Sequence, residues 1–173
     1  MIRIEPYSTS WPGAFAEEAA ALRTAFGPLA LRIDHVGSTA VAGLAAKPVI
    51  DIQISVAQLQ DRTAFEARLA RLQYAHVDLG DFDRVYPFFA KPGRWPNSHH
   101  VHLCVAGSAE EIRHLAFRDH LRADPGAAAE YERLKRALAA VHHGQTLQSR
   151  EAYSLAKTDF VEAVLAKALR KHA

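Results

Sequence analysis

Two segments of the chain alternate apolar and polar side chains, which is the pattern of a β-strand with one face in a core. The first segment, 49–56, places Ile50, Ile52, Ile54 and Val56 on one face and Asp51, Gln53 and Ser55 on the other. The second, 99–106, places Val101, Leu103 and Val105 on one face and His100, His102 and Cys104 on the other. If the two strands are neighbours, we expect their polar faces to coincide, with Asp51 and Gln53 directed outward beside the histidines.

Apolar spacing and capping residues predict the remaining elements. Further strands are expected at 31–36, 74–78 and 84–91, the last at a sheet edge because Pro87 lacks an amide proton. Helices are expected at 11–26 with Ser10 as cap, at 58–73, at 112–122 after a Ser108–Glu111 capping box, from Asp124-Pro125 to Gly144, and from Ser149 to about Arg170. This order predicts an α+β fold, a small mixed β-sheet flanked by helices with a helical C-terminal part.

The size of the chain predicts a single domain. It has 173 residues, of which 49% are hydrophobic, enough for one buried core and too few for two. We therefore expect one domain over residues 1–173, in which a sheet-containing core, 1–107, carries a helical part, 108–173, packed on it.

Composition also limits the partners. The formal net charge is +2 with histidines counted as neutral, so no nucleic-acid surface is predicted. No apolar run approaches the roughly 18 residues of a membrane helix, and no signal-peptide core is visible. Cys104 is the one cysteine, which excludes an internal disulfide and favours a reducing compartment. We expect a cytoplasmic protein that binds neither nucleic acid nor membrane, with its oligomeric state left open.

The stretch between the first two main strands carries the candidate chemistry. Gly37, Ser38 and Thr39 follow the strand at 31–36, and a short helix is expected after them. Backbone amides at such a turn can face an anion, and Lys47 adds a cation nearby. Asp51 lies inside a strand, where an acid is disfavoured unless it has a partner or a function. Together they predict a phosphate or nucleotide site, although the turn alone fits an ordinary strand-to-helix connection.

A divalent ion is a second expectation for this face. Asp51, His100 and His102 are candidate ligands for Mg²⁺ or Mn²⁺, with Asp51 and His102 as candidate catalytic residues. Gln53 stands where a second acid would make a two-metal centre, and an amide is a poor magnesium ligand. The histidines alternatively lie on a wet sheet face, or hydrogen-bond a substrate phosphate.

Several cations are available to neutralise a phosphorylated ligand. Lys47, Arg84, Lys91 and Arg118 are the candidates, acting with Gly37, Ser38 and Thr39, and Lys157 is a further basic residue. Each of them is alternatively a solvated surface charge, and Arg118 alternatively pairs with Asp119 or Asp124.

The sequence resembles a known family in several blocks. HVGSTAVAGLAAKPVIDI resembles the signature block of the GrpB family, and HHVHLCV resembles its His-x-His strand. HLAFRDHLR, then Tyr131 and Lys135 in YERLKRALA, then Lys157 are similar to its helical half. The family is similar to the nucleotidyltransferase superfamily and also occurs fused to dephospho-coenzyme A kinases. The resemblance implies a small mixed sheet flanked by helices, followed by a helical part.

The superfamily pattern is a Gly-Ser turn, an acidic pair on the next strand and a third acid on a later strand. Gly37, Ser38 and Asp51 match it, whereas Gln53 departs from the second acid and histidines stand on the later strand. We therefore expect a protein that binds a nucleotide or other phosphorylated small molecule with a divalent ion. If the protein is an enzyme, the expected reaction is transfer of a nucleotidyl group to a small acceptor or to a protein. The alternatives are a non-catalytic nucleotide-binding or accessory module and a metal-dependent hydrolase using Asp51 and both histidines.

Overall fold

A five-stranded mixed sheet forms the centre of the protein in the computed structural model, which describes residues 2–59 and 62–170. Its strands are β1 (Arg32–Val36), β2 (Ile50–Val56), β3 (Ala75–Val77), β4 (Phe88–Lys91) and β5 (His99–Val105), in the spatial order β1-β2-β5-β4-β3. Strands β2 and β5 are parallel, and the other neighbours are antiparallel.

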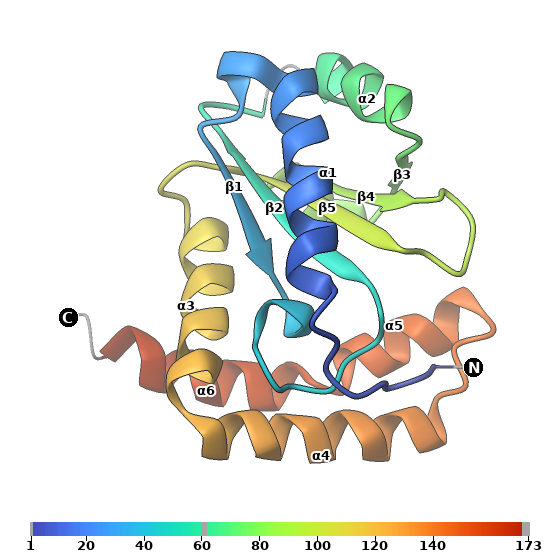
Figure 1. Cartoon of the computed structure of the whole chain (residues 1–173), viewed down its shortest axis with the longest axis vertical. Coiled ribbons are helices and arrows are strands. Elements are labelled where there is room, and N and C mark those ends of the chain that lie inside the picture. The colour runs from blue at the N-terminus through green and yellow to red at the C-terminus, as the bar shows by residue number, and fades with distance from the viewer. Residues whose placement is uncertain (1, 60–61, 171–173) are drawn as a thin grey trace.

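Six α-helices surround this sheet (Figure 1). They are α1 (Trp11–Phe26), α2 (Arg62–Arg71), α3 (Ala109–Ala123), α4 (Pro125–Val141), α5 (Leu147–Leu155) and α6 (Thr158–Arg170). Helix α1 crosses one face of the sheet, while α4, α5 and α6 gather at one end of it (Figure 1). The α+β class with a mixed sheet and a helical C-terminal part is therefore confirmed. No helix within these described ranges is long and apolar enough to span a membrane.

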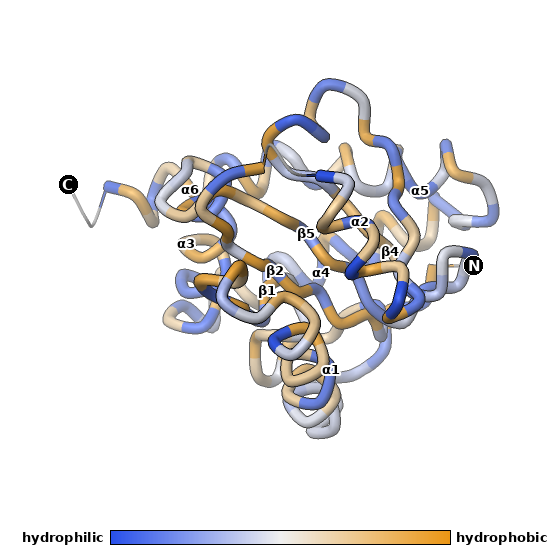
Figure 2. Tube along the Cα trace, turned by 90° about the horizontal axis from the view of Figure 1, so that it is seen from above, coloured by the Kyte–Doolittle hydropathy of each residue, from blue (hydrophilic) through white to orange (hydrophobic). Residues whose placement is uncertain are grey.

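The apolar face of the sheet packs against α1 and α2. Alternate residues of β2 and β5 share a core with residues of the two helices, in accord with the hydrophobic period of two. The members with 0% exposure are Leu22, Ile52, Ile54, Leu69, Val101 and Leu103. Figure 2 shows these central strands as largely hydrophobic segments between helices of mixed character.

The opposite, polar face is covered for much of its length by α3. Gln53 is 0% exposed and accepts a hydrogen bond of 2.8 Å from the Tyr86 hydroxyl. Ser55 is also fully buried and donates to the Glu111 carboxylate of α3. Gln53 lies beside His102 as expected, but the expectation that it faces outward is wrong, because Tyr86, whose ring stacks on His114 of α3, covers it.

Three caps behave differently from one another. Ser108 accepts from the Glu111 amide, but the Glu111 side chain accepts from Gly107 instead of completing a capping box. Asp124 accepts from the Ala127 amide as expected, with Pro125 in the first turn of α4. Ser10 occupies the N-cap position of α1 as expected and the bounds of the helix agree, but its side chain makes no capping bond.

Several elements differ from the expected ones. The segment 84–91 is not one edge strand. A 3₁₀ turn, η3 (Gly80–Arg84), precedes β4, and β3 forms the edge instead. Pro87 lies just before β4, where its missing amide proton is not needed and its carbonyl accepts from Leu103. The helix expected at 58–73 begins at Arg62, and its expected positions 60 and 61 lie outside the described residues.

The expected last helix is two helices. Helix α5 is capped by Thr146 rather than Ser149. The helical conformation is interrupted at Ala156 and Lys157, and α6 begins at Thr158. The short helix expected after the glycine turn is a single 3₁₀ turn, η2 (Ser38–Ala40). A further 3₁₀ turn, η1 (Gly27–Leu29), follows α1.

Candidate functional site

Asp51 and His100 face each other across the two central strands. The parallel register pairs Asp51 with His100 and Gln53 with His102. Nδ1 of His100 lies 3.0 Å from Oδ1 of Asp51. The prediction that the polar faces of the two strands coincide is therefore confirmed by the register.

Asp51 carries a negative charge that is stabilised by its surroundings. Its side chain keeps 29% exposure, at the end of the sheet where β2 begins. Burial alone would raise the pKa of Asp51, but the hydrogen bond and charge of His100, together with the charge of Lys47, lower this pKa to about 2. The carboxylate is thus fully ionised at neutral pH and accessible from one side.

The glycine turn lies directly against this carboxylate. Gly37 has φ +68°, and a β-carbon built there would come within 2.3 Å of Oδ2 of Asp51. Only glycine satisfies both the positive φ and the close approach. Ser38 then begins η2, whose three residues give too short a helix for the dipole contribution that the sequence suggested.

Three lysines from three segments share the electrostatic environment of Asp51. Lys47 precedes β2, Lys135 is on α4, and Lys157 is at the break between α5 and α6. The ammonium groups of Lys47 and Lys157 lie over the ring of Tyr153, at 5.1 and 4.6 Å from its centroid. Because both lysines contact one ring, the break after α5 brings residues more than a hundred positions apart into one cluster.

Lys135 belongs to the same cluster through α4. It is 3% exposed, lies 4.8 Å from the centroid of the Tyr131 ring and donates to the Ala45 carbonyl. Glu132 of the same helix accepts from the Ala45 amide at 3.1 Å. Helix α4 thus bonds both the backbone N–H and the backbone carbonyl of Ala45, and these bonds fix the loop that leads to Lys47.

The lowered pKa values of the three lysines indicate that no neighbouring acid among the described residues neutralises their charges. Burial lowers the pKa of Lys157 to about 7, with a further contribution from the charge of Lys47. Burial likewise lowers the pKa of Lys135 to about 8 and lowers that of Lys47. Within the described residues none of the three ammonium groups forms an ion pair, and Asp51 is the acid whose charge opposes these shifts in all three.

We define the lysine cluster as Lys47, Lys135 and Lys157 with the rings of Tyr131 and Tyr153. Burial raises the pKa of Tyr153 to about 12, so its hydroxyl is neutral. The pKa of Tyr131 is also raised by burial, against a hydrogen bond with Ser38. The cluster therefore carries positive charge and neutral hydroxyl groups around a single carboxylate, which suits a ligand with several anionic oxygens.

His102 has a different environment from His100. Its ring stacks on Tyr86 and Phe88, with centroids 4.6 and 4.8 Å away. Burial lowers the pKa of His102 to about 3, so the ring is neutral at pH 7, and its Nδ1 atom has no hydrogen-bond partner among the residues that the structure describes. No group of three or more His, Cys, Asp or Glu side chains within 2–59 and 62–170 is arranged to hold a metal ion.

Two of the expected phosphate-binding cations, Arg84 and Lys91, lie elsewhere. Arg84 is 82% exposed and pairs with Asp81 at 3.3 Å. Lys91 lies on the α1 face of the sheet, where its ammonium group contacts both carboxylate oxygens of Glu18 at 3.0 and 2.9 Å. The structure does not bring either residue to Asp51.

Arg118 and Thr39 have internal partners. The Arg118 guanidinium donates to the His35 carbonyl at 3.1 Å and to the Asp119 carboxylate. Thr39 is fully buried and donates to the Val49 carbonyl at 3.1 Å. Of the expected phosphate contacts, the structure therefore groups Gly37, Ser38 and Lys47 with Asp51.

Sequence reasoning placed neither Tyr131 nor Tyr153 at the site, and assigned Lys135 only to the helical half. A signal was present, because each tyrosine precedes a lysine by four positions in the chain. That spacing places two side chains on one side of a helix. It is also the spacing of the observed ammonium–ring contacts.

Comparison with known proteins agrees with the fold. The family model described as GrpB protein matches residues 1–167. The chain belongs to the GrpB family. The crystal structure of the conserved protein GrpB from Enterococcus faecalis superimposes with a TM-score of 0.84 at 32% sequence identity. The match covers 98% of this chain and 99% of that one.

Two relatives place the GrpB sequence inside longer proteins. UPF0157 protein YqkA of Bacillus subtilis is 39% identical over 142 residues, covering 82% of this chain and 40% of that protein. A protein named dephospho-CoA kinase, from Mycolicibacterium paratuberculosis, is 35% identical over 158 residues, covering 78% of this chain and 39% of that protein. The chain thus spans about two fifths of the length of each.

Proposed function

We propose that this GrpB protein binds a phosphorylated small molecule, with a nucleotide as the first candidate. The phosphoryl oxygens of this ligand would lie at the lysine cluster. The observation that carries the proposal is the presence of three partly or fully buried ammonium groups with no ion pair in the described structure. A buried charge is costly unless an opposite charge accompanies it. A polyanionic ligand supplies that charge, and the ammonium groups and tyrosine hydroxyls would contact its oxygens.

A second observation favours a nucleotide over a simple anion. A relative of this chain is named dephospho-CoA kinase, and that name supports a nucleotide-related ligand. The accessible carboxylate of Asp51 beside three lysines also gives the site one acceptor among several donors. A ligand with both phosphoryl oxygens and a hydroxyl or amino group would use both kinds of group.

The protein side chains fit a resident divalent ion poorly. Gln53, at the position of a second acid, is fully buried and bonded to Tyr86. Mg²⁺ prefers several oxygen ligands, and the other carboxylate near the described lysines, that of Glu132, is bonded to the Ala45 amide and to Arg136. Mg²⁺ or Mn²⁺ stays a prediction for the ligand-bound state, where phosphoryl oxygens would complete the coordination shell.

The binding function is favoured over nucleotidyl transfer. With pKa values of about 2 and 3, Asp51 and His102 are weak bases at pH 7. Neither would readily remove a proton from an attacking hydroxyl. Transfer to a small acceptor or protein, if it occurs, would rest on positioning and charge neutralisation.

Calorimetric titration with ATP and with pyrophosphate, each with and without Mg²⁺, tests the proposal. We expect saturable binding, weakened at least about tenfold by Lys157→Met, the loss of one charge-assisted contact. Lys167→Met is the matched control, because Lys167 is an exposed lysine on the adjoining helix α6. Equal binding by both variants and the unmodified protein would contradict the proposal.

A transfer assay distinguishes nucleotidyl transfer from nucleotide binding without catalysis. The protein is incubated with labelled ATP, Mg²⁺ or Mn²⁺ and candidate acceptors. Label transfer that disappears in Asp51→Asn would establish a nucleotidyltransferase. Binding without transfer under these conditions would establish a nucleotide-binding module.

A further inference from the structure

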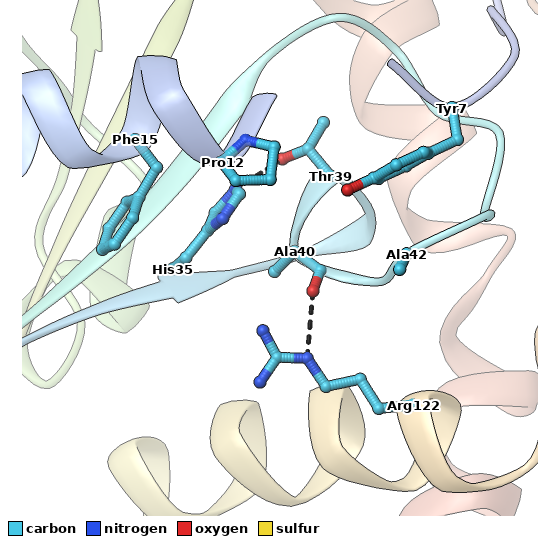
Figure 3. A pocket seen from close by; sticks show the side chains of 8 residues that line it. All are labelled: Tyr7, Pro12, Phe15, His35, Thr39, Ala40, Ala42 and Arg122. Carbon is cyan, nitrogen blue, oxygen red and sulfur yellow. Dashed lines mark hydrogen bonds between the residues drawn. The ribbon is translucent and has the colours of Figure 1, made fainter. Parts of the chain in front are cut away.

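A hollow of about 470 Å³ lies beside the turn formed by Ser38, Thr39 and Ala40 (Figure 3). Helix α1 provides Phe15 to it, the segment before α1 provides Tyr7, and α3 provides Arg122. Thr39 and Ala40 of the turn line this hollow, whereas Ser38 of the same turn hydrogen-bonds Tyr131 of the lysine cluster. The volume is within the range of small-molecule sites, about 300–1,000 Å³.

His35 gives this hollow a hydrogen-bond acceptor. The Thr39 hydroxyl donates its one proton to the Val49 carbonyl, so it can only accept from His35, whose Nε2 atom lies 3.0 Å away. The proton of the neutral ring is therefore on Nε2, and Nδ1 carries a lone pair. Nδ1 has no hydrogen-bond partner among the described residues.

The walls around this acceptor are flat and largely apolar. The rings of His35 and Phe15 stack with centroids 4.7 Å apart and planes 6° apart. Tyr7, Pro12 and Ala42 complete the surface, and Figure 3 shows the Tyr7 hydroxyl directed toward the centre of the group. Such a surface suits a planar ring.

Arg122 gives the hollow a positive charge. Its Nε atom donates to the Ala40 carbonyl at 3.0 Å, which orients the guanidinium beside the hollow (Figure 3). Nη1 lies 3.5 Å from the Asp119 carboxylate, which also accepts two bonds from Arg118. Nη2 has no partner in the described structure, so the guanidinium keeps donors for a ligand carboxylate.

From these three features we infer that the hollow is a second binding site, for an aromatic monocarboxylate with a hydroxyl or N–H group on its ring. The ring packs against Phe15 and Tyr7, the carboxylate pairs with Arg122, and the ring hydroxyl or N–H donates to Nδ1 of His35. This site is independent of the proposed phosphate site, because none of the residues that line the hollow belongs to the lysine cluster.

The test uses 4-hydroxybenzoate and indole-3-carboxylate as probes, with binding followed by calorimetry and by amide chemical shifts. We expect a dissociation constant of about 1 mM or lower for at least one probe, with the largest shifts at Thr39 and Ala40. Arg122→Gln should weaken binding at least about tenfold, since it removes the charged partner. The neutral 4-hydroxybenzamide should bind several-fold more weakly than 4-hydroxybenzoate.

Ala42→Phe is a second variant, chosen because Ala42 is exposed and its replacement fills the hollow without removing a charge. It should abolish probe binding and leave the thermal unfolding midpoint unchanged. Lys157→Met should leave probe binding unaltered, so failure of the phosphate site and failure of this site give different results. No saturable binding of either probe up to about 10 mM, or binding that both Arg122→Gln and Ala42→Phe leave within twofold, would overturn the inference.

Discussion

Gly37 lies so close to Asp51 that a β-carbon at position 37 would meet the Asp51 carboxylate oxygen at 2.3 Å. The turn and the carboxylate are therefore one rigid unit, although fourteen positions separate them in the chain. Any larger residue at position 37 has to displace Asp51, which in turn is bonded to His100.

Replacement of Gly37 by alanine should destabilise the protein by about 2–4 kcal/mol. A residue with a β-carbon at positive φ costs about 1–2 kcal/mol, and the contact with Asp51 adds to this cost. Gly43→Ala is the matched control, since Gly43 has φ +80° but open space around its β-carbon position. Urea unfolding measures both, and equal losses would mean that the turn can move away from Asp51.

Asp51 should stabilise the fold at neutral pH and lose this effect in acid. Its pKa of about 2, against an ordinary value of 3.8, corresponds to about 2 kcal/mol. Because the folded-state pKa is the lower one, the stabilisation is complete above the unfolded value and is lost as the pH falls from about 4 towards 2. Urea unfolding of the unmodified protein and Asp51→Asn at pH 7, 5, 4 and 3 should show a narrowing difference. A difference that stays constant over this range would contradict the lowered pKa.

Lys157→Met should stabilise the ligand-free protein while it weakens ligand binding. The pKa of Lys157 is lowered from 10.5 to about 7, so folding disfavours its charged form. This cost is absent above the unfolded pKa and grows as the pH falls from 10.5 towards 7. Methionine should therefore raise the free energy of unfolding at pH 7 by about 1 kcal/mol or more. Lys167→Met should change it by less than about 0.5 kcal/mol, as usual for a surface position.

The affinity for ATP should fall as the pH rises from 7.5 to 9.5. The charge of ATP is constant over this range, because its terminal phosphate titrates near pH 6. Lys157 and Lys135, with pKa values of about 7 and 8 in the free protein, need their protons to bind the anion. We expect a decrease of about tenfold, measured by calorimetry, and a shallower one in Lys157→Met. An affinity independent of pH would place the anion away from both lysines.

Lys91→Met should reduce stability without affecting nucleotide binding. Its ammonium group neutralises Glu18, whose side chain is 10% exposed, and removal leaves that carboxylate buried without its partner. Such a loss costs about 3–5 kcal/mol in a fully buried pair, and less here because Lys91 is itself 23% exposed. Calorimetry of the folded variant should give an unchanged affinity for ATP, and a clear decrease would show that Lys91 reaches the ligand.

Local patterns accounted for most of the elements, and the exceptions have physical reasons. Alternation over 49–56 and 99–106 was enough to predict both central strands and their shared polar face, because side-chain direction in a strand depends only on position parity. Pro87 indicated an edge strand, but β3 pairs with β4 and takes that place. The sequence could not show this, since a proline just outside a ladder and one at an edge carry the same local signal.

Helical periodicity in the sequence also did not indicate the break between α5 and α6. Apolar residues recur across Ala156 and Lys157 at a spacing that continues one helix, yet the chain turns there. The turn carries Lys157 to the ring that Lys47 also contacts. Packing of α6 against α3 is a long-range contact, and such contacts override local preference.

The sequence alone determined the class of fold, the central pair of strands and the acid that the candidate site is built around, because these follow from periodicity and from residue chemistry. Only the tertiary structure decided which cations accompany Asp51. Arg84, Lys91 and Arg118 contact other partners, while Lys135 comes from α4 and Lys157 from the break between α5 and α6. Charge is a property of a residue type, but its position depends on how sheet and helices pack, and no local pattern contains that information.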